Sequence, residues 1–209
     1  MNPRVRVKIC GLTNEEDARK AIELGADALG FNLWPGSQRC IELDREAAWM
    51  RDLPPLVTRV AVLVNAPLEE AQRVATHPGI DLVQFHGDED ESYCAAFAKT
   101  GRPFIKALRI RDAASLEKLA QFSTPHVLLD ADAGGAYGGT GIRIDPALAA
   151  EAVRRFPRWK IILAGGLTPE NVAEAVRSVR PYAVDVASGV ESQPRRKDHG
   201  KLERFLAAV

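Results

Sequence analysis

Two side chains that can transfer protons follow directly after short apolar segments of this chain. Cys10 comes after VRVKI at residues 5–9, and Asp130 comes after VLL at residues 127–129. A thiolate can act as a general base and a carboxylic acid as a general acid, so together they could move protons on one substrate. The two residues lie far apart in the sequence, and their cooperation therefore depends on a fold that brings them together.

Two glycine-containing turns also follow apolar segments. One contains Gly165 and Gly166, and the other contains Ser188 and Gly189. Because glycine lets backbone N–H groups approach an anion closely, these turns predict a phosphate site. The plain alternative is that the glycines only make tight turns, and two such turns after neighbouring strands favour the phosphate site.

Eight strand-like segments alternate with helix-like segments along the whole chain. They comprise residues 5–9, 28–31, 57–64, 82–85, 104–108, 127–130, 160–164 and 183–186. This alternation with short connections predicts a single closed (β/α)8 barrel, a TIM barrel, as one domain over residues 1–209. An open doubly wound sheet is disfavoured because no GxGxxG motif follows the first strand. The strands of a parallel barrel all end at one face, which would gather Cys10, Asp130 and the glycine turns.

Sequence signals also predict where helices begin and end. Thr13 and Glu16 have the spacing of a capping box, and Gly25 is expected to end the helix that follows. Residues 168–170, TPE, predict an N-cap with proline at the first helical position. The last helix is expected at residues 202–208.

The composition argues against several classes of protein. The 209 residues carry 28 basic and 28 acidic side chains without a basic stripe, so neither a nucleic-acid partner nor a membrane partner is expected. The charged N-terminal segment does not resemble a signal peptide, and no apolar run approaches the ~20 residues of a membrane span. Three cysteines without a CxxC motif and four histidines without HExxH predict a reducing compartment, the cytoplasm, and no metal site.

Side-chain alternation along the strands predicts which polar residues face the barrel interior. If the apolar partners face the helices, the inward set is Lys8, Cys10, Gln84, His86, Lys106, Asp130 and Asp185. A buried charge is costly unless it is paired. Because the first and eighth strands become neighbours when the barrel closes, we expect Lys8 and Asp185 to form an internal ion pair.

Six motifs, in order along the chain, relate the sequence to a known family. They are KICGLTNEEDA at the start, WPGSQR at 34–39, VQFHGDE at 83–89, LLDA and GGTG within 128–141, LAGGLTPENV at 163–172 and VDVASGVE at 184–191. With these motifs the chain resembles the phosphoribosylanthranilate isomerases over essentially its whole length. The resemblance implies a (β/α)8 barrel and the rearrangement of N-(5-phosphoribosyl)anthranilate to 1-(2-carboxyphenylamino)-1-deoxyribulose 5-phosphate in tryptophan biosynthesis. It also implies that the reaction needs no cofactor.

The resemblance implies roles for individual residues in this Amadori rearrangement. Cys10 would be the base that removes the C2′ proton, and Asp130 the acid that protonates the ring oxygen. Arg39 would bind the anthranilate carboxylate, which a guanidinium can hold through two hydrogen bonds. His86 and Asp185 are expected in the wall of the site, although a structural, hydrogen-bonded histidine is nearly as good an interpretation of His86.

The same resemblance implies a phosphorylated small-molecule substrate. Its phosphate would lie at Gly165, Gly166, Ser188 and Gly189, and the glycine-rich residues 138–141 would form a flap. The family includes monomers and homodimers, so the oligomeric state stays open.

The base must start as a thiolate. Since burial alone raises the pKa of a thiol, a cation must oppose it, and Lys8 on the same strand face is the expected one.

The sequence departs from the common family pattern away from the predicted catalytic residues. Cys40 stands where an aromatic residue is usual and could loosen the anthranilate pocket, whereas Phe85 for leucine is expected to be a packing change. Ala187 stands in place of a frequent serine, and residues 193–198 replace a glycine-containing turn.

Two other functions remain open at this point. One is the histidine-pathway isomerase, which performs the same rearrangement with a pair of aspartates. The other is a non-catalytic barrel that binds a phosphorylated ligand. Cys10 argues against the first, and the presence of both Cys10 and Asp130 argues against the second.

Overall fold

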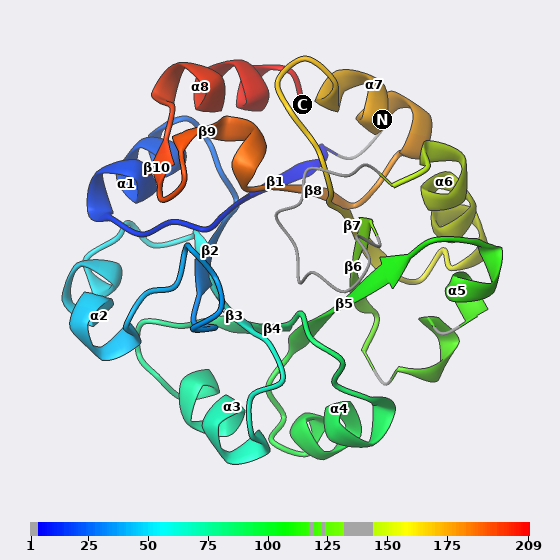
Figure 1. Cartoon of the computed structure of the whole chain (residues 1–209), viewed down its shortest axis with the longest axis horizontal. Helices are drawn as coiled ribbons and strands as arrows, with labels where there is room; N and C mark the ends of the chain where they lie inside the picture. The colour runs from blue at the N-terminus through cyan, green and yellow to red at the C-terminus, as the bar shows by residue number, and fades with distance from the viewer. Residues whose placement is uncertain (1–3, 118, 123, 132–143) are drawn as a thin grey trace.

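Eight parallel strands close into a barrel that is surrounded by helices (Figure 1). The computed structural model of the chain describes residues 4–117, 119–122, 124–131 and 144–209. The strands pair in sequence order, and the barrel closes where Lys8 of the first strand pairs with Asp185 of the eighth. The predicted (β/α)8 architecture is therefore confirmed.

The described elements alternate as the sequence pattern predicts. The strands are β1 (Arg6–Cys10), β2 (Ala28–Asn32), β3 (Thr58–Leu63), β4 (Leu82–Phe85), β5 (Phe104–Ile110), β6 (His126–Ala131), β7 (Lys160–Leu163), β8 (Ala183–Val186), β9 (Glu191–Gln193) and β10 (Arg196–Lys197). The α-helices are α1 (Glu15–Glu23), α2 (Leu43–Arg51), α3 (Leu68–Ala75), α4 (Glu91–Ala98), α5 (Ala113–Glu117), α6 (Pro146–Arg155), α7 (Val172–Val179) and α8 (His199–Ala207). Two short 3₁₀ helices are η1 (Leu119–Gln121) and η2 (Ser188–Val190).

Two apolar layers lie on opposite faces of the strands, because successive side chains of a strand alternate in direction. The larger layer lies between strands and helices and includes Phe85, whose ring packs against Tyr93, Phe97 and Phe104. The expectation that Phe85 is a packing change is therefore confirmed. The inner layer consists of Val60, Ile105, Ala107, Leu128, Ile162, Ala164 and Ala183.

The prediction that Lys106 points into the barrel is wrong. Its neighbours Ile105 and Ala107 belong to the inner layer, so Lys106 lies on the helix side of β5. There its ammonium donates to the Gly87 carbonyl at 2.8 Å and to Glu89 at 2.7 Å. The prediction assumed that the apolar residues of every strand face the helices. On β5 the apolar residues Ile105 and Ala107 face the barrel interior instead, so Lys106 faces the helices.

The sequence placed three helix starts incorrectly, and one of them is α8, which begins at His199 after the N-cap Asp198 and not at residue 202. The N-cap of α1 is Asn14, which accepts from the Asp17 amide, whereas the Thr13 hydroxyl donates to the Arg195 carbonyl. Helix α7 begins only after Asn171, which caps the preceding turn by accepting from the Thr168 amide. Gly25, with a φ of 99°, follows the end of α1 as expected.

The hairpin β9–β10, residues 191–197, was not predicted. It begins directly after η2 and lies beside α1 in Figure 1. Arg195 in its turn has a φ of 74°, a left-handed conformation that favours glycine. Its side chain donates to the carbonyls of Gln38 and Cys40 at 3.0 and 2.9 Å, which ties the hairpin to the loop after β2.

Candidate active site

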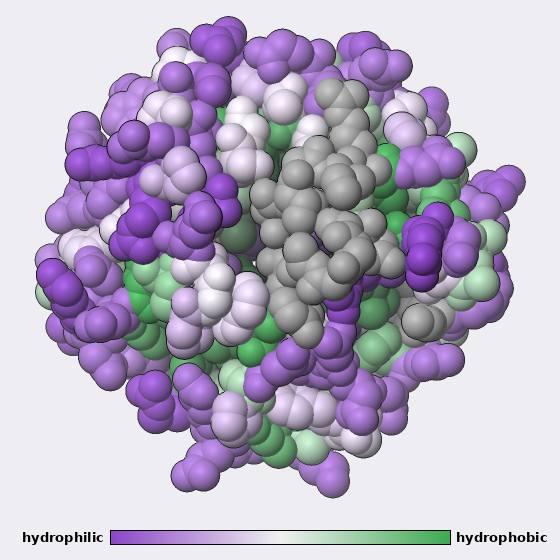
Figure 2. Space-filling view, viewed as in Figure 1, coloured by the Kyte–Doolittle hydropathy of each residue, from purple (hydrophilic) through white to green (hydrophobic). Residues whose placement is uncertain are grey.

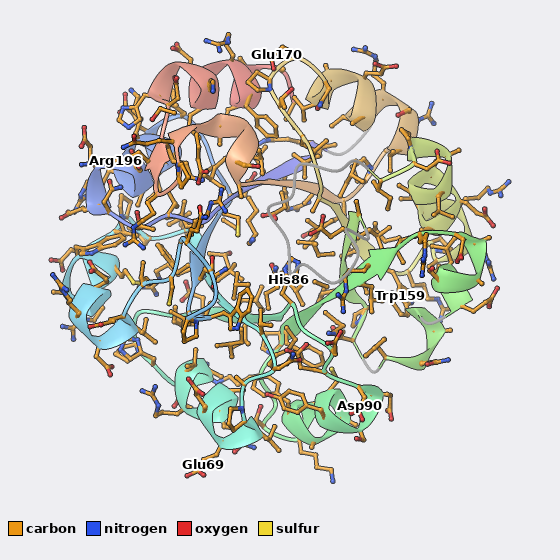
Figure 3. All side chains as sticks on the ribbon, viewed as in Figure 1. Glu69, His86, Asp90, Trp159, Glu170 and Arg196 are labelled. Atoms are coloured by element: carbon orange, nitrogen blue, oxygen red, sulfur yellow. The ribbon has the colours of Figure 1, made fainter. Side chains whose placement is uncertain are left out.

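A cavity of about 630 Å³ lies at the C-terminal ends of the barrel strands. The site residues predicted from the sequence all line it: Cys10, Arg39, His86, Asp130, Gly165, Gly166, Asp185, Ser188 and Gly189. Figure 3 shows His86 inside the ring of strands, whereas Glu69, Glu170 and Arg196 lie at the periphery. The rim of this face is mostly hydrophilic (Figure 2). The fold thus brings together residues from both ends of the sequence.

Cys10 lies above the buried ion pair of Lys8 and Asp185. The Lys8 ammonium is 2.7 Å from Asp185 Oδ1, and both side chains are less than a tenth exposed, so the predicted ion pair is confirmed. Gly30 of β2 makes room for this group, since a Cβ there would lie 2.7 Å from the Cys10 sulfur and 2.9 Å from Lys8 Nζ. The three side chains therefore form one packed unit at the base of the cavity.

The charges around Cys10 act on its thiol in opposite directions. Burial raises the pKa of Cys10, Lys8 lowers it, Asp185 raises it and Lys197 lowers it, and the net direction is upward. Burial by itself lowers the pKa of Lys8, but Asp185 and Cys10 outweigh burial and raise it. A cation that opposes the burial of the thiol is therefore in place, and Lys197 is a second one that the sequence did not indicate.

Asp130 at the end of β6 contacts His86 through its carboxylate. His86 Nε2 lies 3.3 Å from Asp130 Oδ2, while Asp130 Oδ1 accepts from the Ala131 amide at 2.9 Å. On its other side His86 Nδ1 lies 2.8 Å from Gln84 Nε2. The Oε1 atom of Gln84 is buried and has no hydrogen-bond partner among the described residues. His86 therefore connects the interior of β4 to the carboxyl group of Asp130.

Arg39 reaches the cavity from the loop between β2 and α2, where it is held by a residue that the sequence analysis did not single out. Its Nε and Nη2 donate to the two oxygens of Glu191 at 2.7 and 2.6 Å. Lys197 lies 3.1 Å from the same carboxylate. Glu191 is the last residue of the VDVASGVE motif, but nothing in the pattern indicated that it pairs with Arg39 from the loop after β2.

The two glycine turns require glycine for different reasons. Gly165 and Gly166 have φ values of 85° and 61°, in the left-handed region that side chains disfavour. A Cβ on Gly189 would lie 1.8 Å from the Leu167 carbonyl oxygen, so the turn after β8 packs directly on the turn after β7. The Ser188–Val190 segment forms η2. These close-packed backbones form one side of the cavity.

Two further expectations concern a flap over the cavity and the effect of Cys40 on the anthranilate pocket. The predicted flap at residues 138–141 lies outside the described residues. Cys40 is not among the described residues that line the cavity, and its sulfur contacts the Ile41 carbonyl at 3.7 Å. The idea that Cys40 loosens the pocket therefore gains no support.

In the described part of the chain, no helix is long and apolar enough to cross a membrane. The same residues contain no group of three or more His, Cys, Asp and Glu side chains that could hold a metal ion.

A closed parallel barrel with proton-transferring side chains and glycine turns at its C-terminal face is typical of (β/α)8-barrel enzymes with phosphorylated substrates. The chain belongs to the N-(5'-phosphoribosyl)anthranilate isomerase family, whose model matches residues 7–208. The isomerase of Magnetococcus marinus is 46% identical, with 98% of this chain and 95% of the relative covered.

Solved structures agree with this assignment. The crystal structure of the isomerase from Thermotoga maritima has a TM-score of 0.89 and 39% identity, with 98% of each chain covered. A second isomerase structure, in complex with reduced 1-(o-carboxyphenylamino)-1-deoxyribulose 5-phosphate, has a TM-score of 0.84 and 37% identity, again with 98% of each chain covered. The protein is an isomerase of tryptophan biosynthesis, which rearranges N-(5-phosphoribosyl)anthranilate to the 1-deoxyribulose 5-phosphate product. The histidine-pathway alternative is not supported.

Proposed function

We propose that Cys10 is the general base and Asp130 the general acid of this rearrangement. The observation that carries the proposal is their convergence, from β1 and β6, on one cavity that is also lined by the glycine turns. Both residues lie at strand ends, where barrel enzymes place their catalytic groups.

The chemistry divides into two proton transfers. Asp130 donates its proton to the furanose ring oxygen as the C1′–O bond breaks and the nitrogen lone pair forms the protonated imine. The Cys10 thiolate then removes the proton from C2′, and the electrons of that C–H bond form the enolamine. Loss of the proton from the C2′ hydroxyl and protonation of C1′ give the ketone. His86 contacts the Asp130 carboxyl group and orients it toward the substrate.

A direct assay tests the activity itself. The purified protein should consume freshly made phosphoribosylanthranilate, followed by the loss of its fluorescence. A non-catalytic barrel would bind the compound without consuming it.

We expect Arg39 to bind the anthranilate carboxylate. Arg39→Met should weaken binding of the reduced product analogue by about 1.5–3 kcal/mol, the range for a hydrogen bond to a charged group. Isothermal titration calorimetry with the analogue, and with the same compound lacking the carboxylate, measures the effect. The second compound should bind Arg39→Met as well as it binds the wild type. Equal weakening of both compounds would mean that Arg39 is structural.

We expect inorganic phosphate to occupy the turns of Gly165–Gly166 and Ser188–Gly189. Phosphate should compete with substrate and raise the melting temperature, and at a concentration of about a hundred times Kd it should add about 2.7 kcal/mol of stability. Gly189→Val should abolish this shift because even its Cβ would overlap the Leu167 carbonyl.

The control for this prediction is Gly101→Ala, at a glycine that has open space around its Cβ position. This variant should keep the phosphate-induced shift measured by thermal denaturation. Crystals soaked in sulfate that hold the ion elsewhere, and not beside Gly166 and Gly189, would contradict the placement.

We infer that residues 1–209 form one catalytic domain that acts as a monomer or a homodimer. The phosphoribosylanthranilate isomerase of Thermotoga maritima is described as dimeric. Light scattering after size-exclusion chromatography distinguishes the two states for this chain. The free thiols of Cys10, Cys40 and Cys94 support a reducing location, the cytoplasm.

A further inference from the structure

The buried carboxylate of Glu191 holds the guanidinium of Arg39 in place. Both oxygens of Glu191 accept hydrogen bonds from Arg39, and the Glu191 side chain is only 5% exposed. Two parallel N–H···O bonds fix the plane of a guanidinium as well as its position. They use two of its five N–H donors, so three remain for a ligand in the cavity.

Lys197 neutralises this carboxylate and anchors it to the backbone of the site. The Lys197 side chain is 1% exposed, and its ammonium lies 3.1 Å from Glu191 Oε1. The same ammonium donates to the carbonyls of Cys10 at 2.7 Å and Ala187 at 3.0 Å. The guanidinium, the carboxylate and the ammonium together carry a net charge of +1, which suits a singly charged anionic ligand.

The side chain of Arg39 crosses the chain directly after Cys10. A Cβ on Gly11 would lie 2.4 Å from Arg39 Cδ, and the φ of Gly11 is 75°, so both space and conformation require glycine there. The Arg39 stem therefore lies against the end of β1, one residue from the thiol. A shift of the guanidinium would change its distance from the reacting centre.

We propose that Glu191, held by Lys197, is a positioning residue that preorganises Arg39 for the carboxylate of the substrate. The inference rests on the proposed role of Arg39 and adds the residue that fixes the orientation of its guanidinium. A guanidinium that is already fixed loses little conformational freedom when the substrate binds, so Glu191 contributes to affinity without touching the substrate.

Glu191→Gln tests the proposal, because it keeps the shape of the side chain but replaces one acceptor oxygen with an amide donor that faces Arg39. The Kd of the reduced product analogue and the KM should each rise by about tenfold or more, whereas kcat should change by less than about threefold, since uniform binding is lost. The analogue without the carboxylate should bind with wild-type affinity. Glu203→Gln, on the exposed side of α8, is the matched control and should change none of these values.

A double-mutant cycle with Arg39→Met separates positioning from a purely structural role. In the Arg39→Met background, Glu191→Gln should cause no further loss of affinity for the carboxylated analogue. A full additive loss, or equal weakening of both analogues by Glu191→Gln, would show that Glu191 only stabilises the hairpin, and the proposal would fall. Wild-type affinity in Glu191→Gln would also overturn it.

Binding of the two analogues to the single variant Arg39→Met tests separately whether Arg39 binds the substrate carboxylate. If Arg39→Met alone weakens both analogues equally, the carboxylate does not bind at Arg39, whatever Glu191→Gln does. If Glu191→Gln shows no cooperative thermal unfolding, Glu191→Asp replaces it under the same criteria. Aspartate keeps the charge beside Lys197 but is one methylene too short for the two contacts with Arg39.

Discussion

Cys10→Ala and Asp130→Asn should each lower kcat by at least about a hundredfold, the usual scale for a general base or acid. Each change removes the proton-accepting or proton-donating group and leaves the cavity lining otherwise intact. The reduced product analogue should bind both variants nearly as well as the wild type, because these groups act on the transition state. Steady-state kinetics of phosphoribosylanthranilate consumption and calorimetry with the analogue give the two values.

Two variants outside the cavity control for the general effect of removing a thiol or a carboxylate. Cys40→Ala removes a thiol that does not line the cavity, and Asp44→Asn changes a side chain that is 80% exposed. Both should retain wild-type kcat. If Cys10→Ala or Asp130→Asn kept activity within tenfold of the wild type, the assignment of that residue would be wrong.

The barrel could be predicted from the sequence because each β/α unit carries its own local signals. Alternation of apolar segments gave the strands, and closure of the barrel then dictated that Lys8 and Asp185 meet. The same logic assigned Lys106 to the wrong face, since alternation alone does not say which set of side chains is the inner one. Two apolar layers, one on each face of the sheet, make that choice ambiguous in a barrel.

The convergence of the nine predicted residues on one cavity followed from the strand ends and the family motifs. Glu191 and Lys197 were missed because their contacts join a hairpin after β8 to the loop after β2. No local periodicity encodes such a contact. The hairpin was missed for a related reason, since Arg195 occupies a position whose φ is usually marked by glycine.

Lys8→Met should have the second large effect, because it leaves Asp185 buried without its counterion. Removal of one partner of a buried ion pair typically costs about 3–5 kcal/mol. Lys8→Met with Asp185→Asn should recover most of this loss, since no uncompensated charge remains. Urea denaturation at pH 7 measures both. The pKa of Lys8 is raised in the folded protein, so the stability contributed by the pair is fully present below the ordinary value of 10.5 and is lost only as the pH rises beyond it.

The same substitutions should move the pH dependence of kcat/KM, whose acidic limb reflects ionisation of the thiol together with its neighbours. Lys8 lowers the pKa of Cys10 and Asp185 raises it, with Lys8 the larger influence. Asp185→Asn should therefore shift the acidic limb to lower pH, and the folded double mutant should shift it to higher pH with a reduced rate at pH 7. A double mutant that keeps the wild-type profile would show that Lys8 does not tune the thiol. Lys197, the other cation that lowers the pKa of Cys10, would then be the group that favours the thiolate, and Lys197→Met should produce the shift that Lys8→Met does not.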